Sequence, residues 1–89
     1  MTLVRRVTII NRRGLHARAA AKFAQMASTF DADIVVAKDG TEVPGGSIMG
    51  LMMLAASPGC EVELRASGDQ AEQAIDALAR LIADRFDED

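Results

Sequence analysis

The alternation of apolar and polar residues predicts four β-strands and three α-helices in the order βαββαβα. β-Branched or alternating apolar residues indicate strands at 2–10, 34–36, 41–43 and 60–66. Apolar residues that return every three or four positions indicate helices at 16–28, at 47–54 and near the C-terminus, where Ala71, Ile75, Leu78 and Ile82 form one stripe. Strands with one apolar face predict an antiparallel sheet covered by helices on that face and solvated on the other, a two-layer α+β fold.

Three short motifs predict how these elements begin and turn. Asp39-Gly40 is the preferred pair for a two-residue hairpin, whose central residues take positive φ. Ser47 is a natural N-cap for the second helix. Asp69 followed three residues later by Glu72 resembles a capping box and predicts the start of the last helix.

Length and composition limit the class of protein. The 89 residues suffice for one domain, 1–89, and 49% hydrophobic with 26% charged residues is ordinary for a soluble globular protein. The longest apolar run, 48–56, is far short of a membrane span, and the basic residues Arg5 and Arg6 are not followed by the apolar region that a signal peptide needs. We therefore expect a cytoplasmic protein that does not engage membranes.

The single cysteine excludes an internal disulfide, and no second Cys or His accompanies it for a metal site. Its place in an alternating strand predicts that Cys60 is a buried, inert thiol. Three Phe and no Trp or Tyr argue against binding of single-stranded nucleic acid, which needs exposed aromatic side chains for base stacking.

Charge is segregated along the chain. Six basic residues and no acid precede Asp31, whereas four basic and thirteen acidic residues follow from there. A basic first third could meet nucleic acid, an anionic membrane or an acidic protein. Segregation by chance onto solvated faces is the simpler interpretation of the charge alone.

The only histidine, His16, lies where a strand gives way to an alanine-rich helix, in Gly14-Leu15-His16-Ala17-Arg18. Helix N-termini attract anions, because their first N–H groups lack partners and the peptide dipoles align. Gly14 allows positive φ or a close backbone approach, small Ala17 leaves the imidazole accessible, and Arg18 offers a planar fork of donors to phosphoryl oxygens. We therefore expect an exposed His16 that carries or meets a phosphate; the more ordinary role of such a histidine is capping or packing.

Residues 47–54 form the second candidate site. A helix this short cannot bury all of its large apolar side chains, and exposed methionines make adaptable partner surfaces. We assign Leu51 and Leu54 to the core, whereas core and partner-facing roles are equally open for Ile48, Met49 and Met52. Ser47 caps the helix, and a phosphate there would bring negative charge onto this surface.

Stand-alone catalysis is not expected. A Ser-His-Asp or Cys-His arrangement would have to use His16, and no acid or cysteine carries a sequence signal of pairing with it. Gly45-Gly46-Ser47 lacks the lysine and the spacing of a phosphate-binding loop. No cofactor or metal is expected.

Residues 14–20, Gly-Leu-His-Ala-Arg-Ala-Ala, and 46–52, Gly-Ser-Ile-Met-Gly-Leu-Met, resemble the two signatures of the HPr family. These are the histidine-containing phosphocarriers of the bacterial phosphoenolpyruvate-dependent phosphotransferase system. The resemblance covers essentially the whole chain, including the order of strands and helices. It implies an open-faced β-sandwich with three helices over four antiparallel strands.

The resemblance also implies the roles of individual residues. His16 would take a phosphoryl group at Nδ1 from the phosphohistidine of Enzyme I and pass it to a histidine of an EIIA-type domain, while Arg18 stabilises the group. Ser47 would be the regulatory serine that an HPr kinase/phosphorylase modifies in some bacteria. The expected docking residues are Ala17, Ala21, Ile48, Met49 and Met52, with Lys22 adding charge steering to a monomeric carrier.

One position departs from the family pattern. The usual proline after the arginine is Ala19 here, which loosens the first helical turn slightly although alanine is a good helix former. The Gly-Leu-His-Ala-Arg-Ala form is similar to the nitrogen-related branch, whose outputs are regulatory. Two alternatives stay open: a purely regulatory binding module controlled through Ser47, and, least favoured, a small ligand-binding domain.

Overall fold

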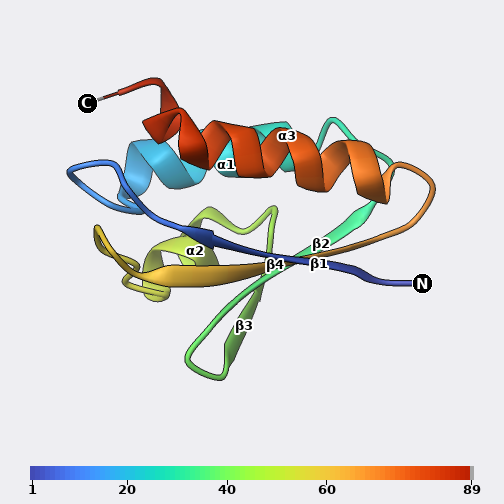
Figure 1. Cartoon of the computed structure of the whole chain (residues 1–89), viewed down its shortest axis with the longest axis horizontal. Helices are drawn as coiled ribbons and strands as arrows, with labels where there is room; N and C mark the ends of the chain where they lie inside the picture. The colour runs from blue at the N-terminus through green and yellow to red at the C-terminus, as the bar shows by residue number, and fades with distance from the viewer. Residues whose placement is uncertain (89) are drawn as a thin grey trace.

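The chain builds a four-stranded antiparallel sheet with strand order β1-β4-β2-β3, and its helices cover one face of that sheet (Figure 1). The computed structural model describes residues 1–88, so Asp89 lies outside the described part. The elements are β1 Leu3–Thr8, α1 Ala17–Ala27, β2 Asp33–Lys38, β3 Thr41–Pro44, α2 Ile48–Met53, β4 Glu61–Ser67, α3 Ala71–Ala83 and a short 3-10 turn, η1, Arg85–Asp87. The predicted order βαββαβα and the two-layer α+β class are confirmed.

The central strand β4 shows why the sheet has one dry face. Val62, Leu64 and Ala66 are each at most 2% exposed and face the helices, whereas the alternate residues are exposed or half-buried. Val62 lies opposite Val7 of β1, and Leu64 lies opposite Val36 of β2. The alternation in the sequence therefore sets which face of the sheet packs on the helices.

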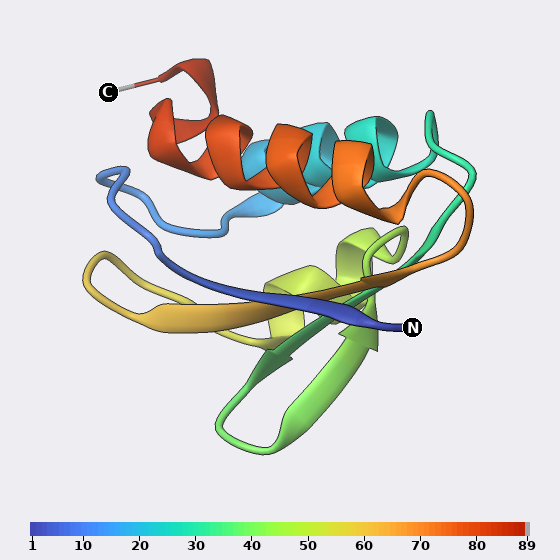
Figure 2. The same ribbon diagram turned by 45° about the vertical axis from the view of Figure 1, so that its right-hand side comes forward.

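Helices α1 and α3 run side by side across this dry face (Figures 1 and 2). Alanines of α1 surround the buried Phe23, and their small side chains let the two helices and the sheet approach closely. α3 supplies the larger side chains of its buried stripe, Ile75, Leu78, Leu81 and Ile82. The core thus lies between the sheet and two amphipathic helices, as the spacing of apolar residues predicts.

Two of the predicted local motifs are confirmed. Asp39 and Gly40 take φ values of 51° and 83°, which is the conformation that a two-residue hairpin turn requires. The Ser47 hydroxyl accepts a hydrogen bond from the Gly50 N–H at 3.0 Å and caps α2.

The predicted capping box before α3 is wrong. Gln70, not Asp69, is the N-cap residue, and no side chain caps the helix. Gly68, at φ 111°, lies so close to Ala32 that an added Cβ would be 3.1 Å from the Ala32 Cα. The Gln70 side chain accepts a hydrogen bond from the Asp31 N–H at 2.7 Å, so packing on the loop before β2 fixes the helix entry and leaves Asp69 exposed.

Cys60 is half-buried and immediately precedes β4, so the prediction of a buried thiol is also wrong. Its sulfur lies 3.4 Å from the Ser57 hydroxyl oxygen. This hydrogen bond lowers the pKa of the Cys60 thiol.

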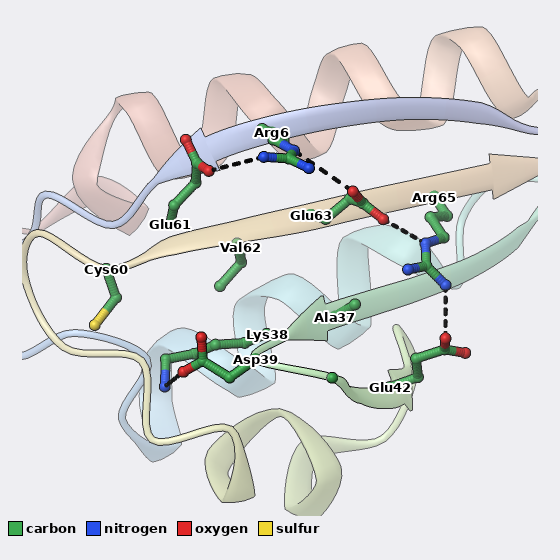
Figure 3. A pocket seen from close by; sticks show the side chains of 11 residues that line it. Arg6, Ala37, Lys38, Asp39, Glu42, Cys60, Glu61, Val62, Glu63 and Arg65 are labelled. Atoms are coloured by element: carbon green, nitrogen blue, oxygen red, sulfur yellow. Dashed lines mark hydrogen bonds and ion pairs between the residues drawn. The ribbon is translucent and has the colours of Figure 1, made fainter.

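Ion pairs cover the open face of the sheet (Figure 3). Arg65 donates to Glu63 at 2.6 Å and to Glu42 at 2.8 Å, and Arg6 lies 3.6 Å from both Glu61 and Glu63. The hydrogen bond from Arg65 is the main cause that lowers the pKa of Glu63. These charged pairs stay in water and line a shallow hollow, which agrees with the predicted solvated face.

Candidate functional site

His16 occupies the N-cap position of α1, as the sequence predicts. Its backbone is extended, with φ −78° and ψ 179°, and its carbonyl accepts the first helical hydrogen bond, from the Ala20 N–H at 2.8 Å. The next N–H groups, at positions 17–19, begin the helix and have no carbonyl to bond within it. No acidic residue lies in this first turn, so the turn itself carries no negative charge that would oppose binding of an anion to these N–H groups.

Gly14 fixes the path of the loop that delivers His16. Its φ is 64°, and a Cβ added there would lie 2.5 Å from the carbonyl oxygen of Ala56. The next residue, Leu15, is buried and donates its N–H to the same oxygen at 2.9 Å. Both expected reasons for a glycine at this position, positive φ and close backbone approach, are therefore present.

The imidazole of His16 is not exposed, contrary to the expectation from the sequence. Its side chain is only 14% accessible, because the end of the chain folds back onto it. Nε2 of His16 lies 2.8 Å from Oε1 and 3.0 Å from Oε2 of Glu88. Glu88 is the neighbour of His16 that sequence reasoning missed, since an acidic residue 72 positions away carries no sequence signal of contact with His16.

Asn11 joins His16 and Glu88 in one hydrogen-bonded cluster. It is fully buried in the core, and its Nδ2 donates to the Gly14 carbonyl and to Oε1 of Glu88, each at 2.7 Å. Its Oδ1 is buried and has no partner within residues 1–88. The hydrogen bond from His16 is the main cause that lowers the pKa of Glu88; the Asn11 bond adds to it, and partial burial opposes it.

The predicted neighbours of His16 differ in their surroundings. Ala17 and Arg18 are exposed at the helix start, whereas Ala21 and Lys22 are half-buried. The Lys22 ammonium donates to the Phe86 carbonyl at 2.8 Å, which fastens it to the C-terminal turn. Arg18 forms no ion pair within residues 1–88, so none of these carboxylates holds its guanidinium.

α2 presents an apolar surface beside this site. Leu51 and Leu54 are buried as predicted, while the side chains that the sequence left open between core and surface are exposed: Ile48 42%, Met49 71% and Met52 39%. Met53, at 77% exposure, belongs to the same surface and was not singled out from the sequence. α2 packs against α1, and Leu15 bonds to the segment that follows α2, so this surface adjoins the His16 loop.

Other kinds of site receive no support from the described residues. Residues 1–88 contain no cluster of three or more His, Cys, Asp or Glu side chains that could hold a metal ion. None of the helices described over the same residues is both long and apolar enough to cross a membrane. The hollow on the open face of the sheet involves neither His16 nor Glu88.

Comparison with known proteins places these features in a family. A family model described as the PTS HPr component phosphorylation site matches residues 3–84. The chain is 49% identical to the phosphocarrier protein HPr of Cupriavidus necator, over 97% of both chains, and 43% identical to the phosphocarrier protein NPr of Shewanella violacea, over 97% of this chain and 94% of that one. Its fold matches the crystal structure of HPr-C-His from Thermoanaerobacter tengcongensis with a TM-score of 0.93, at 47% identity and 98% coverage of both chains.

Proposed function

Because the chain belongs to the HPr family, the phosphocarriers of the phosphotransferase system, we propose that His16 is the residue that carries the phosphoryl group. The supporting observation is the place of His16 at the N-cap of α1, in a turn without acids, next to the exposed Arg18. We take residues 1–89 as one phosphocarrier domain that acts as a monomer in the cytoplasm.

In this proposal His16 accepts the phosphoryl group from the phosphohistidine of Enzyme I and passes it to a histidine of an EIIA-type domain. A bond from phosphorus to the imidazole nitrogen forms as the bond to the donor histidine breaks, and the donor keeps its electron pair. The reverse exchange with the acceptor returns His16 to its starting form. No cofactor and no net proton transfer is needed.

Arg18 and the start of α1 stabilise the transferred group. A phosphoryl group carries about −1.5 to −2 charges near neutral pH. Each charge-assisted hydrogen bond from the Arg18 guanidinium contributes about 1.5–3 kcal/mol, and the helix terminus adds about 0.3–1 kcal/mol. These magnitudes suit a group that is held briefly and then released.

The apolar surface of α2 is the proposed docking site for both partners. Ile48, Met49 and Met52 are exposed beside the His16 loop, and Ala17 and Ala21 extend the surface onto α1. Exposed methionines adapt to differently shaped partners, which fits a carrier that must bind two of them in turn.

Ser47 is the proposed regulatory site, for an HPr kinase/phosphorylase. Its half-buried hydroxyl already accepts the Gly50 N–H, and a phosphate at a helix N-terminus is electrostatically tolerated. The modification would set negative charge beside Ile48 and Met49 and weaken docking. His16 together with Arg18 favours the carrier over a purely regulatory module, which requires neither residue.

Whether the output is sugar uptake or nitrogen-related regulation depends on the acceptor. Relatives named HPr and NPr match this chain at similar identity, 49% and 43%. Our proposal therefore concerns the carrier step, which is common to the two branches. Because Ala19 replaces the usual proline, any test should include acceptors of the nitrogen-related branch.

Incubation with Enzyme I and labelled phosphoenolpyruvate tests the proposal. The wild-type chain should take up label that is labile in acid and stable in base, and His16→Ala should take up none. Circular dichroism and urea unfolding of the variant serve as the control for folding. No uptake by the wild-type chain, with an Enzyme I that labels a known HPr, would rule out the carrier function.

A further inference from the structure

We propose that Glu88 is a positioning residue for phosphoryl transfer: it holds the Nε2–H of His16 and leaves the Nδ1 lone pair free to take the phosphoryl group. The inference rests on the carrier function proposed for His16. It adds to that site a carboxylate from the opposite end of the chain. Three features of the structure support it: the contact with the imidazole, the bond from Asn11 and the shape of the C-terminal turn.

The contact defines which imidazole nitrogen carries the proton. Nε2 lies 2.8 Å and 3.0 Å from the two oxygens of Glu88. The hydrogen bond from His16 holds the pKa of Glu88 below its usual value, so this carboxyl is ionised near neutral pH and can only accept. Nε2 must therefore donate, and a neutral imidazole then keeps its lone pair on Nδ1. Nδ1 receives no hydrogen bond within residues 1–88.

Asn11 orients the carboxylate in turn. Its Nδ2 donates both to Oε1 of Glu88 and to the Gly14 carbonyl, at 2.7 Å each. Since both partners are acceptors, the amide nitrogen must face them, and its oxygen is left buried without a partner within residues 1–88. Asn11 and His16 therefore share Oε1 of Glu88 as their acceptor.

The C-terminal turn is shaped to bring Glu88 to this place. Arg85, Phe86 and Asp87 have φ values of 58°, 54° and 60°, and three consecutive non-glycine residues in the left-handed region are uncommon. The buried Phe86 side chain and the bond from Lys22 to the Phe86 carbonyl hold the turn against α1. Figure 1 shows this end of the chain beside the N-terminal part of α1.

The proposed arrangement needs no proton to move during transfer. The Nδ1 lone pair forms the new bond to phosphorus while the donor's phosphorus–nitrogen bond breaks. The ring then carries a positive charge, and the Glu88 carboxylate at Nε2–H compensates it. When the group leaves, the electron pair of the phosphorus–nitrogen bond returns to Nδ1 and the contact with Glu88 is unchanged. Glu88 thus stabilises the charged form of the ring without touching the phosphoryl group.

Imidazole ¹H–¹⁵N NMR, at about pH 8 where an unperturbed ring is neutral, reads the tautomer directly. We expect the wild-type ring almost wholly in the Nε2–H form. Glu88→Ala should lower the ratio of the Nε2–H to the Nδ1–H form about tenfold and slow the first-order acceptance of phosphoryl from Enzyme I by a similar factor. Glu88→Gln keeps an acceptor oxygen, so it should retain the tautomer and lose only part of the rate.

Asp87→Asn is the matched control, because it removes one neighbouring exposed charge at a residue type that tolerates positive φ and makes no bond to His16. It should match the wild type in tautomer and rate. If Glu88→Ala equals Asp87→Asn in both measurements while the wild type is labelled, the positioning role is wrong and the carrier function stands. If the wild type takes no label, the carrier function itself fails.

Discussion

Replacing Gly14 by alanine tests how strictly the backbone must deliver His16 to the helix start. A residue with a Cβ at the observed φ of 64° costs about 1–2 kcal/mol. The added Cβ would also stand 2.5 Å from the Ala56 carbonyl oxygen, which is backbone and cannot swing away. The loop must shift, and the 2.9 Å hydrogen bond from Leu15 to that oxygen, worth about 0.5–1.5 kcal/mol, is lost or lengthened.

Together these effects predict a loss of about 1.5–3.5 kcal/mol in the free energy of unfolding for Gly14→Ala, measured by urea denaturation. Thermal midpoints should fall by about 4–8 °C for each kcal/mol in a domain of this size. Phosphoryl acceptance should slow as well, because the displaced loop carries His16.

Alanine substitutions at two other glycines separate the strain of positive φ from the steric clash of the added Cβ. Gly40 has φ 83° with no atom near its missing Cβ, so Gly40→Ala measures the strain alone, about 1–2 kcal/mol. Gly46 has neither constraint, and Gly46→Ala should change stability by less than about 0.5 kcal/mol. Equal losses for Gly14→Ala and Gly40→Ala would refute the steric part of the reasoning.

Three further predictions concern the rest of the molecule. Glu63→Gln should destabilise the fold at neutral pH, because it removes the ionised carboxylate that Arg65 holds. Arg65 lowers the pKa of Glu63 in the folded state, so the pair stabilises the fold at pH values above the unfolded pKa of about 4.5. This stabilisation is lost as the pH falls through the lower folded pKa. Urea titrations below pH 4 and at pH 7 should thus give a smaller wild-type-to-variant difference in acid, and a constant difference would contradict the assignment. Leu51→Ala should lower the free energy of unfolding by about 2–5 kcal/mol, because Leu51 is fully buried. Met49→Ala should leave this free energy nearly unchanged and weaken binding to Enzyme I, as measured by calorimetry. Similar stability losses for both variants would show that Met49 is not a surface residue. Arg18→Ala should slow phosphoryl transfer more than it weakens docking, and equal losses in stopped-flow and calorimetric measurements would remove this division of roles.

The fold could be predicted from the sequence because it depends on local spacing. The alternation in residues 60–66 sets the faces of β4, and the hairpin at Asp39-Gly40 and the cap at Ser47 are short-range motifs. Where tertiary contact overrides a local motif, the prediction fails. Asp69 does not cap α3, because the packing of Gly68 on the loop at Ala32 decides where the helix begins.

The site was predictable only in part, for the same reason. His16 and Arg18 lie two residues apart, so the sequence alone brings them together at the helix start. Glu88 reaches His16 only because a left-handed turn, anchored by Phe86, reverses the chain after α3. Positive φ at three ordinary residues has no signature in the sequence, so the partner of His16 and its low exposure were missed.

The most direct test of the carrier account is to find where the phosphoryl group sits. After incubation with Enzyme I and phosphoenolpyruvate, ¹⁵N-labelled protein can be examined by ³¹P and ¹H–¹⁵N NMR. The account predicts phosphorus bonded to Nδ1 of His16, with Nε2 still protonated toward Glu88. Phosphorus on Nε2, or on any residue other than His16, would contradict it.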